Sequence, residues 1–316
     1  TVKNLGLFPM IKIGVSYLYA RLFPLPEKSL EDFYINRFGR ELYQTFFRDY
    51  TEKVWGVPCS QIAPDWGAQR VKGLSITQTL LHAVRRLFSP PSDLAQKGVE
   101  TGAEERIEGD YFVSSMPISE LVGCLEGVRV PAPVLQVARS LPFRDFITVG
   151  LLLRGLKVGG GVRDNWIYIP EPDVKLGRLQ IFNNWSPYMV SDPNTVWVGL
   201  EYFVNEGDDL WSLPDSAMIE LGIQELCKIE MIRPEDVLDG TVLRVKKTYP
   251  AYFGAYNQFE VVRSYLDRFE NLFLVGRNGM HRYNNQDHSM LTAMVAVENM
   301  QSGRIDKTNI WSVNVE

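Results

Sequence analysis

The chain has 316 residues, and 33 Lys plus Arg against 38 Asp plus Glu give a formal net charge of −5 at pH 7. A protein that neutralises nucleic-acid phosphates normally carries a basic face, so this balance argues against nucleic acid as a partner. Hydrophobic residues make up 45% and charged residues 22%, which excludes disordered and fibrous classes. A chain of this size forms one large or two moderate domains.

The cysteines indicate a reducing compartment. Cys59, Cys124 and Cys227 are odd in number and far apart, which does not match a disulfide framework. We therefore expect a cytoplasmic protein.

The most apolar early stretch runs from Leu7 to Leu25 and contains Lys12 and Arg21. Charges at these positions argue against a bilayer span, and a signal peptide would have a different order of segments. We predict an amphipathic or buried helix, not a membrane anchor, and no transmembrane segment. Its apolar face could pack internally or against another subunit, so the oligomeric state stays unknown.

The first third of the sequence is helical in pattern. Ser29 and Asp32 form a helix start, and apolar residues recur at three- and four-residue steps from Leu30 to Phe47, with an interruption near Gly39. A second helix is predicted from Ser75 to Phe88. The Pro-, Gly- and charge-rich residues 89–109 then indicate a linker, a loop or a shortened insertion.

Strands and helices mix in the rest of the chain. A short strand, Asp110 to Ser115, precedes a helix from Ile118 to Leu125. The β-branched and aromatic segments between Phe143 and Phe203 predict an antiparallel sheet of about four strands, with Gly159 to Gly161 as a hairpin connection. The remaining predicted elements are a helix from Asp215 to Ile229, a strand near Thr241 to Lys247, a buried strand from Leu272 to Val275 and a final helix from about Asp287 to Met300.

The chemistry of the chain is best sought between residues 271 and 300. There a buried strand runs into Gly276 and Arg277, and Asp287, His288 and Ser289 open the final helix. Glycine permits close backbone approach, Arg277 can grip a phosphate with two donors, and a helix N-terminus favours an anion or an electron-rich ring edge. A plain strand-to-helix connection with Arg277 paired locally fits the spacing equally well. The three histidines support no metal site.

Three patches of sequence in this order resemble one superfamily. The strand, Gly-Arg pair, aromatic turn and helix of residues 271–300 resemble the carboxyl-terminal flavin-binding segment of the flavin amine oxidase and protoporphyrinogen oxidase superfamily. DYTEKVWGVPCSQI, residues 49–62, is similar to the YTxKxWG segment of the UDP-galactopyranose mutases, and DYFVSSMP, residues 110–117, is similar to a strand and turn that approach the dinucleotide. The resemblance spans about residues 29–300.

The resemblance implies an FAD cofactor held largely by the final strand and helix. The implied cofactor-binding residues are Gly276, Arg277, Asn285, Gln286, Asp287, His288, Ser289, Ser115 and Pro117. Amides at the start of the helix would lie against the pyrimidine edge of the flavin and stabilise the negative charge of its reduced form.

The resemblance also implies substrate contacts. Tyr283 and Trp55 match substrate-facing aromatic positions, and Arg70 is a candidate for anion contact. Trp55 fits equally well as a buried aromatic that stabilises the turn after a helix. His288 is the candidate catalytic acid or base if it faces the pocket, and a helix-start residue turned to solvent is the alternative.

The expected fold is α/β, mixed with α+β features, of the FAD-dependent oxidoreductase type. It comprises an incomplete dinucleotide-binding domain, an antiparallel-sheet substrate domain and a helical cap, because the superfamily's N-terminal GxGxxG segment has no match here. The expected division is a helical cap and substrate region at 1–88, a linker or truncated insertion at 89–109, FAD-domain parts at 110–126 and 265–304, and the sheet domain at 127–264.

The expected function is FAD-dependent oxidoreduction through flavin N5 on a small-molecule or nucleotide-sugar substrate. After Arg70 the chain continues VKGLS, where the mutases carry a further arginine, which favours another substrate on the same scaffold. Two alternatives remain: a UDP-galactopyranose mutase-like sugar isomerase, and an inactive partial chain.

Overall fold

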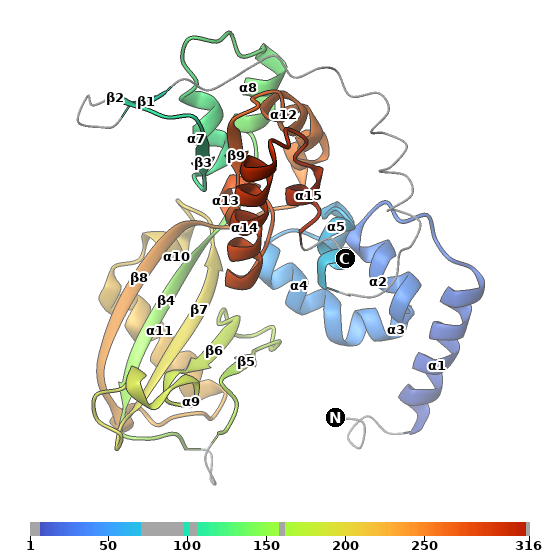
Figure 1. Cartoon of the computed structure of the whole chain (residues 1–316). Coiled ribbons are helices and arrows are strands. Elements are labelled where there is room, and N and C mark those ends of the chain that lie inside the picture. The colour runs from blue at the N-terminus through green and yellow to red at the C-terminus, as the bar shows by residue number, and fades with distance from the viewer. Residues whose placement is uncertain (1–6, 71–97, 101–105, 158–161, 314–316) are drawn as a thin grey trace. The chain divides into compact units, whose positions relative to one another are not determined.

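The computed structural model describes residues 7–70, 98–100, 106–157 and 162–313 (Figure 1). The chain divides into two compact units. Unit 1 contains residues 1–62 and 143–248, and unit 2 contains residues 63–142 and 249–316. Each unit is therefore assembled from two stretches that are distant in sequence. The helix predicted from Ser75 to Phe88 and the Gly159–Gly161 connection lie outside the described residues.

The helices of unit 1 begin and break where the sequence predicts. The Asp32 amide donates to Ser29 Oγ at 3.3 Å, and the Ser29 amide donates to Asp32 Oδ2 at 3.1 Å, which caps the helix start. Gly39, at φ +79°, interrupts the apolar stripe, and a Cβ there would lie 2.7 Å from the backbone nitrogen of Tyr17. Only glycine allows this close crossing. These helices are α1 (Leu7–Leu22), α2 (Leu30–Phe38), α3 (Arg40–Leu42), a π-helical turn (Tyr43–Phe47), α4 (Arg48–Trp55) and a 3-10 turn (Cys59–Gln61).

The second stretch of unit 1 forms a five-stranded sheet with the order β5-β6-β7-β4-β8. The pairs β4–β7, β5–β6 and β6–β7 are antiparallel, which confirms the predicted antiparallel sheet. The strand predicted near Thr241 to Lys247 joins the same sheet as its fifth strand. The strands are β4 (Phe143–Leu153), β5 (Trp166–Tyr168), β6 (Arg178–Ile181), β7 (Val196–Val204) and β8 (Val237–Pro250).

One face of this sheet forms the core of unit 1. Alternate residues of β4 and β7, such as Val149 and its partner Leu200, are fully buried. Helix α11 (Asp215–Lys228) contributes Met218 and Leu226 to the same cluster. A Cβ added at Gly222 would lie 3.1 Å from Leu200, so glycine lets the helix approach the sheet closely. The shorter helical elements are α9 (Phe182–Trp185), a 3-10 turn (Pro187–Met189), α10 (Asp209–Ser212) and a 3-10 turn (Pro234–Asp236).

Unit 2 is organised around two short strands that pair in parallel, β3 (Phe112–Ser114) and β9 (Leu272–Leu274). Another pair, β1 (Gly98–Glu100) and β2 (Arg106–Glu108), is antiparallel. The helical elements are α5 (Asp65–Arg70), α7 (Ile118–Gly123), α8 (Ala132–Arg139), a 3-10 turn (Gly254–Gln258), α12 (Phe259–Leu266), α13 (Gly276–Gly279), α14 (Gln286–Ser302) and α15 (Thr308–Trp311).

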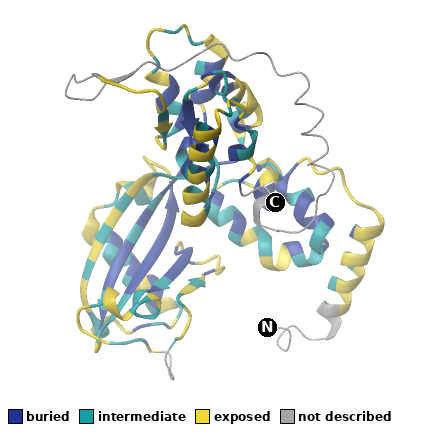
Figure 2. Cartoon of the chain, in the orientation of Figure 1, coloured by how far each residue is buried: buried dark blue, intermediate teal, exposed yellow. Residues whose placement is uncertain are grey.

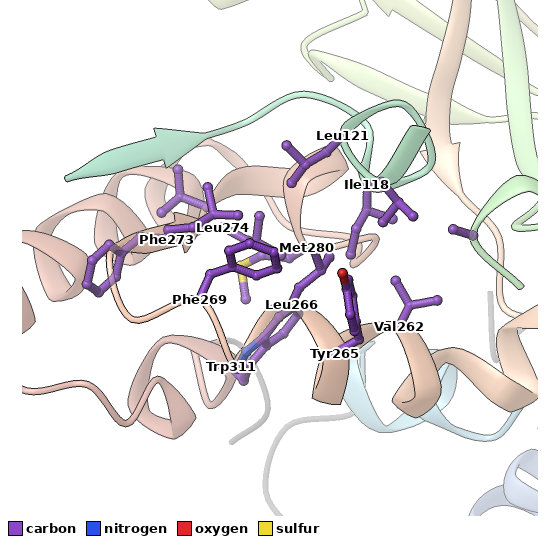
Figure 3. Packing of buried hydrophobic residues seen from close by; sticks show 14 of the residues in the cluster. Ile118, Leu121, Val262, Tyr265, Leu266, Phe269, Phe273, Leu274, Met280 and Trp311 are labelled. Carbon is purple, nitrogen blue, oxygen red and sulfur yellow. The ribbon is translucent and has the colours of Figure 1, made fainter. Parts of the chain in front are cut away.

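The core of unit 2 gathers residues from both of its stretches (Figure 3). Ile118 from α7, Val262 and Leu266 from α12 and Phe273 from β9 are all at most 1% exposed in one cluster. Figure 2 shows this buried centre under exposed helix surfaces. The strand β9 is thus fixed between helices, and the chain that leaves its carboxyl end has a defined position.

Candidate functional site

The site starts at Gly276, where the chain leaves β9. The Val275 amide donates to Ser114 O at 3.0 Å, and the Gly276 amide donates to Thr292 Oγ1 at 3.1 Å. Gly276 has φ +74°, and a Cβ built on it would lie 3.9 Å from both Ser115 Cβ and Ser289 Oγ. Glycine is therefore favoured by conformation, and it lies buried between two serines that a Cβ would just contact.

The turn after Gly276 crosses the end of β3 at close range. A Cβ on Gly279 would lie 2.6 Å from Ser114 O and 3.1 Å from Ser115 Cα. This approach holds Ser115, which is exposed, beside the turn. Pro117 is the residue before the first turn of α7, with φ −52° and ψ 128°. The structure thus brings the predicted Ser115 next to Gly276 and gives Pro117 the role of a helix start.

Arg277 closes the turn. Its Nε and Nη2 atoms donate to Asn284 O at 2.9 and 2.8 Å. The guanidinium carbon lies 5.2 Å from the ring centre of Tyr249 and 4.8 Å from that of Tyr283, and the two rings are 15° from coplanar. Of the two readings of the sequence, local pairing of Arg277 is the one that the contacts show. Its planar fork and its stacking both require arginine.

Tyr283 belongs to an aromatic cluster within unit 2. Its amide donates to the Tyr252 hydroxyl at 2.6 Å, and its ring meets Trp66 edge-on with 5.0 Å between ring centres. Trp66 also lies 5.8 Å from the ring of Tyr252. The predicted substrate residue Tyr283 is therefore held on both its backbone and its ring. Sequence reasoning did not identify Trp66, Tyr249 and Tyr252, because they are far from Tyr283 along the chain.

Helix α14 begins at the end of this turn. Asn285, Gln286 and Asp287 are exposed, and the Ser289 hydroxyl donates to Oδ1 of the buried Asn284 at 2.9 Å. The first amides of any helix have no partner within the helix and carry a partial positive charge. The start of α14 can therefore accept an anionic oxygen close to Gly276.

His288 takes part in the cap of its own helix. The Asn285 amide donates to His288 Nδ1 at 3.3 Å, and an Asp287 carboxylate oxygen lies 3.2 Å from the same nitrogen. The side chain is 14% exposed. Because Nδ1 accepts the amide hydrogen, Nε2 carries the ring hydrogen in this tautomer and can donate it to another group.

The other turn histidine, His281, is fully buried and has φ +45°. Its Nε2 lies 3.3 Å from Ala251 O, and the rings of Tyr256 and Phe259 lie about 6 Å away, at 6.1 and 5.9 Å. Burial lowers the pKa of His281 from 6.5 to about 4. This residue stabilises the turn from inside unit 2.

The YTEKVWG segment lies in unit 1, where Lys53 anchors it. Lys53 Nζ donates to the carbonyl oxygens of Ile169, Glu171 and Leu176 at 3.0, 2.7 and 3.2 Å. Burial lowers the pKa of Lys53. The motif lysine thus joins α4 to the loop before β6.

Trp55 ends α4 and is 2% exposed. Arg144 holds the backbone beside it, because Nε donates to Val54 O at 2.9 Å and Nη2 donates to Phe203 O at 3.1 Å. A Cβ on Gly56 would lie 2.9 Å from the Arg144 guanidinium. Trp55 therefore has the surroundings of a core residue. Arg70 is the last residue of α5, and its side chain lies outside the described residues.

A polar network on the other face of the unit 1 sheet was not found from the sequence. Arg178 and Glu201 are paired across β6 and β7, form an ion pair and are 3% and 2% exposed. Gln180 also donates to Glu201, and the Arg178 guanidinium carbon lies 4.5 Å from the ring centre of Trp166 and 4.8 Å from that of Phe203. Burial raises the pKa of Glu201, and Arg178 opposes that rise. The sequence signal that could have revealed this network is a charged residue within an otherwise apolar strand.

Comparisons with known proteins support this architecture. No family model matches the chain. Among solved structures, a reduced UDP-galactopyranose mutase is similar with a TM-score of 0.75 at 19% identity, over 96% of this chain and 73% of that chain. This chain shares the fold of that protein. A protein described as a putative protoporphyrinogen oxidase from Exiguobacterium sp. 255-15 has a TM-score of 0.58 at 13% identity, over 93% of this chain and 73% of that one.

An oxidoreductase from Methanosarcina mazei is also similar, with a TM-score of 0.53 at 12% identity, over 88% of this chain and 69% of that one. Identities this low establish the shared fold and not a shared substrate. The expected mixed α/β architecture with an antiparallel sheet is thus confirmed. The roles of the individual residues rest on the local geometry.

Proposed function

We propose that this chain is a flavin-dependent enzyme, an FAD-dependent oxidoreductase that acts on a small-molecule or nucleotide-linked substrate. The observation that carries the proposal is the backbone at Gly276. It combines φ +74°, the absence of a side chain beside Ser115 and Ser289, and the nearby N-terminus of α14. A phosphate or a flavin ring edge fits such a place because backbone amides and small side chains allow close approach.

The residues around Gly276 fit the cofactor in distinct ways. Ser115 would donate its hydroxyl hydrogen, and the amides of Gln286 and Asp287 would face an anionic oxygen. The hydroxyl hydrogen of Ser289 is donated to Asn284 Oδ1, so Ser289 would contribute its oxygen lone pairs. Asn285 would continue this rim from the exposed side of the turn. Arg277 would act by keeping the turn closed through Asn284 O, with its positive charge nearby.

A bound flavin would supply hydride transfer at N5. The chain's contribution is then to place the ring and to stabilise charge, and the amides at the start of α14 would favour a negatively charged ring edge. His288 Nε2 is the candidate proton donor, with Nδ1 held by the Asn285 amide. Tyr283, Trp55 and Arg70 remain the proposed substrate residues.

The test is a titration of the purified chain with FAD, followed by flavin fluorescence and absorbance. Gly276→Val would place side-chain atoms in the space between Ser115 and Ser289, so we expect FAD to bind at least tenfold more weakly. Gly303→Val is a matched control: Gly303 ends the same helix at φ +65°, and a Cβ there meets nothing within 4 Å. Both variants introduce backbone strain of about 1–2 kcal/mol, so this strain is common to the two.

Equal loss of FAD binding in both variants would show that strain, and not access at Gly276, controls binding. A wild-type chain that leaves flavin fluorescence unchanged would contradict the proposed cofactor contact itself.

A mutase-like sugar isomerase is the second candidate, favoured by the TM-score of 0.75 with a reduced UDP-galactopyranose mutase. Such an activity would act on UDP-galactopyranose without net redox change. We would detect it as conversion of that sugar nucleotide only after reduction of the flavin. Turnover that consumes an electron acceptor would instead support the oxidoreductase.

A further inference from the structure

Helix α1 in unit 1 presents a continuous apolar face outward. Ile11, Val15, Leu18 and Leu22 recur at helical spacing, and their exposed fractions are between 57 and 72%. Phe23, directly after the helix, is 63% exposed. Figure 2 shows exposure along the described length of this helix. The sequence left open a buried helix, and the buried alternative is wrong for this face. Contiguous exposed apolar faces normally mark an interaction surface.

The outward direction of this face is fixed by contacts on the opposite side of α1. Ala20 is buried, and the Glu41 amide donates to Ser16 Oγ at 3.1 Å. The backbone at Tyr17 lies against Gly39, where no side chain could fit. These small residues hold α1 on α2 and α3. A rotation of α1 about its axis that buried Leu18 and Leu22 would break these contacts with α2 and α3.

The charges of α1 are all basic. Its sequence LFPMIKIGVSYLYARL contains Lys12 and Arg21 and has no Asp or Glu. Lys12 is 62% exposed on its side chain, although it contacts Glu41 at 3.0 Å. Tyr19 is 66% exposed near the C-terminal end of the helix. Basic residues beside an apolar stripe, with amphipathic aromatic rings at its end, are the pattern of a helix that lies in a membrane interface.

We propose that α1 is an interfacial helix that docks onto an anionic lipid surface. Ile11, Val15, Leu18, Leu22 and Phe23 enter the acyl boundary, and Lys12 and Arg21 contact lipid phosphates. No helix in the described part of the chain is long and apolar enough to cross a membrane. In this proposal the helix lies along the surface, which is a different role from the membrane-spanning anchor that its charges exclude.

A second copy of the chain fits this face less well. Two-fold pairing through the apolar stripe would bring Arg21 of both copies to one seam, and α1 offers no carboxylate to pair with it, while Lys12 is already paired with Glu41. An anionic lipid surface removes this repulsion, because it supplies the opposite charge.

The second exposed apolar helix face provides a matched control. On α14, Leu291 and Met294 are 45% and 60% exposed, but this helix carries Asp287 and Glu298 and has no Lys or Arg. An exposed apolar helix face is thus available without the basic charges.

The experiment is co-sedimentation of the full chain with vesicles of phosphatidylcholine containing 30% phosphatidylglycerol, a composition chosen as roughly that of an anionic membrane surface. We expect binding that falls at least fivefold on pure phosphatidylcholine vesicles. The variant Leu18→Ser/Leu22→Ser should lose at least tenfold in binding. The control variant Leu291→Ser/Met294→Ser should bind as the wild type does, and both variants should keep the wild-type circular dichroism.

Absence of wild-type binding to either vesicle would overturn the proposal, as would equal loss in the two variants. Analytical ultracentrifugation gives the competing result: a wild-type dimer that dissociates in Leu18→Ser/Leu22→Ser, with no vesicle binding, would assign the face to a second copy. Binding of FAD is independent of this outcome, because the Gly276 turn lies in unit 2.

Discussion

Arg178 in unit 1 and Arg277 in unit 2 share one local geometry and have different electrostatic surroundings. Each guanidinium lies about 5 Å from two aromatic rings, Trp166 and Phe203 for Arg178, and Tyr249 and Tyr283 for Arg277. Arg178 forms an ion pair with a buried carboxylate across two strands. Arg277 donates to a backbone carbonyl seven residues away.

The comparison separates two uses of the same side chain. Arg178 and Glu201 neutralise each other and are almost fully buried. The role of this pair is therefore structural: it determines which face of the sheet packs at this position. Arg277 is half-buried and restrains a turn beside exposed helix amides. Arg277 keeps its positive charge while it holds the backbone of the turn, which is suited to a binding site. The neutralised Arg178–Glu201 pair in the interior is suited to a structural role.

The largest expected effect comes from breaking the Arg178 pair. Glu201→Gln keeps the size of the side chain but leaves a buried guanidinium without its carboxylate, so we expect the free energy of unfolding to fall by about 3–5 kcal/mol. Urea unfolding followed by tryptophan fluorescence measures it.

The double variant Arg178→Met/Glu201→Leu removes both charges and should regain most of the lost stability. If the double variant were as unstable as Glu201→Gln, packing and not charge would control this face.

The second prediction concerns pH and the turn that Arg277 closes. The pKa of His281 is about 4 in the folded chain against 6.5, so the unfolded chain binds more protons between these values. Stability should therefore fall as pH falls from 7 toward 4, and the His281 contribution between pH 7 and pH 5 is about 2 kcal/mol.

His281→Asn tolerates the positive φ and cannot titrate. The free energy of unfolding of the wild type minus that of the variant, plotted against pH, should show this slope. A flat difference would mean that burial does not lower the pKa of His281 in the folded chain.

A smaller effect is expected from Arg277→Lys. Lysine keeps the charge and loses the planar fork that donates twice to Asn284 O, so we expect a loss of about 1 kcal/mol together with weaker FAD binding. Arg304→Lys, at an exposed pair with Asp306, is the control and should change stability by less than about 0.5 kcal/mol.

If Arg277→Lys bound FAD as the wild type does, the contribution of Arg277 to FAD binding would come from its charge alone. Loss of binding without loss of stability would instead indicate direct contact between the guanidinium fork and the cofactor.

The sequence was informative wherever the determinant is local. Ser29 and Asp32 marked a helix start because their side chains reach amides only three residues away. The strands from Phe143 to Val204 were visible because β-branched and aromatic residues suit a pleated, half-buried surface. The strand before Gly276 and the helix α14 after it were predicted because a strand, a glycine and a helix opening follow one another directly.

The tertiary structure alone decided contacts that depend on strand register and on distant segments. Arg178 meets Glu201 because β6 pairs with β7, and β3 pairs with β9 across some 160 residues, as Ser114 and Leu274 show. Likewise, the apolar stripe of α1 was readable in the sequence, but its outward direction was not. Periodicity reports that a helix has an apolar face, while the packing of its opposite face determines where that face points.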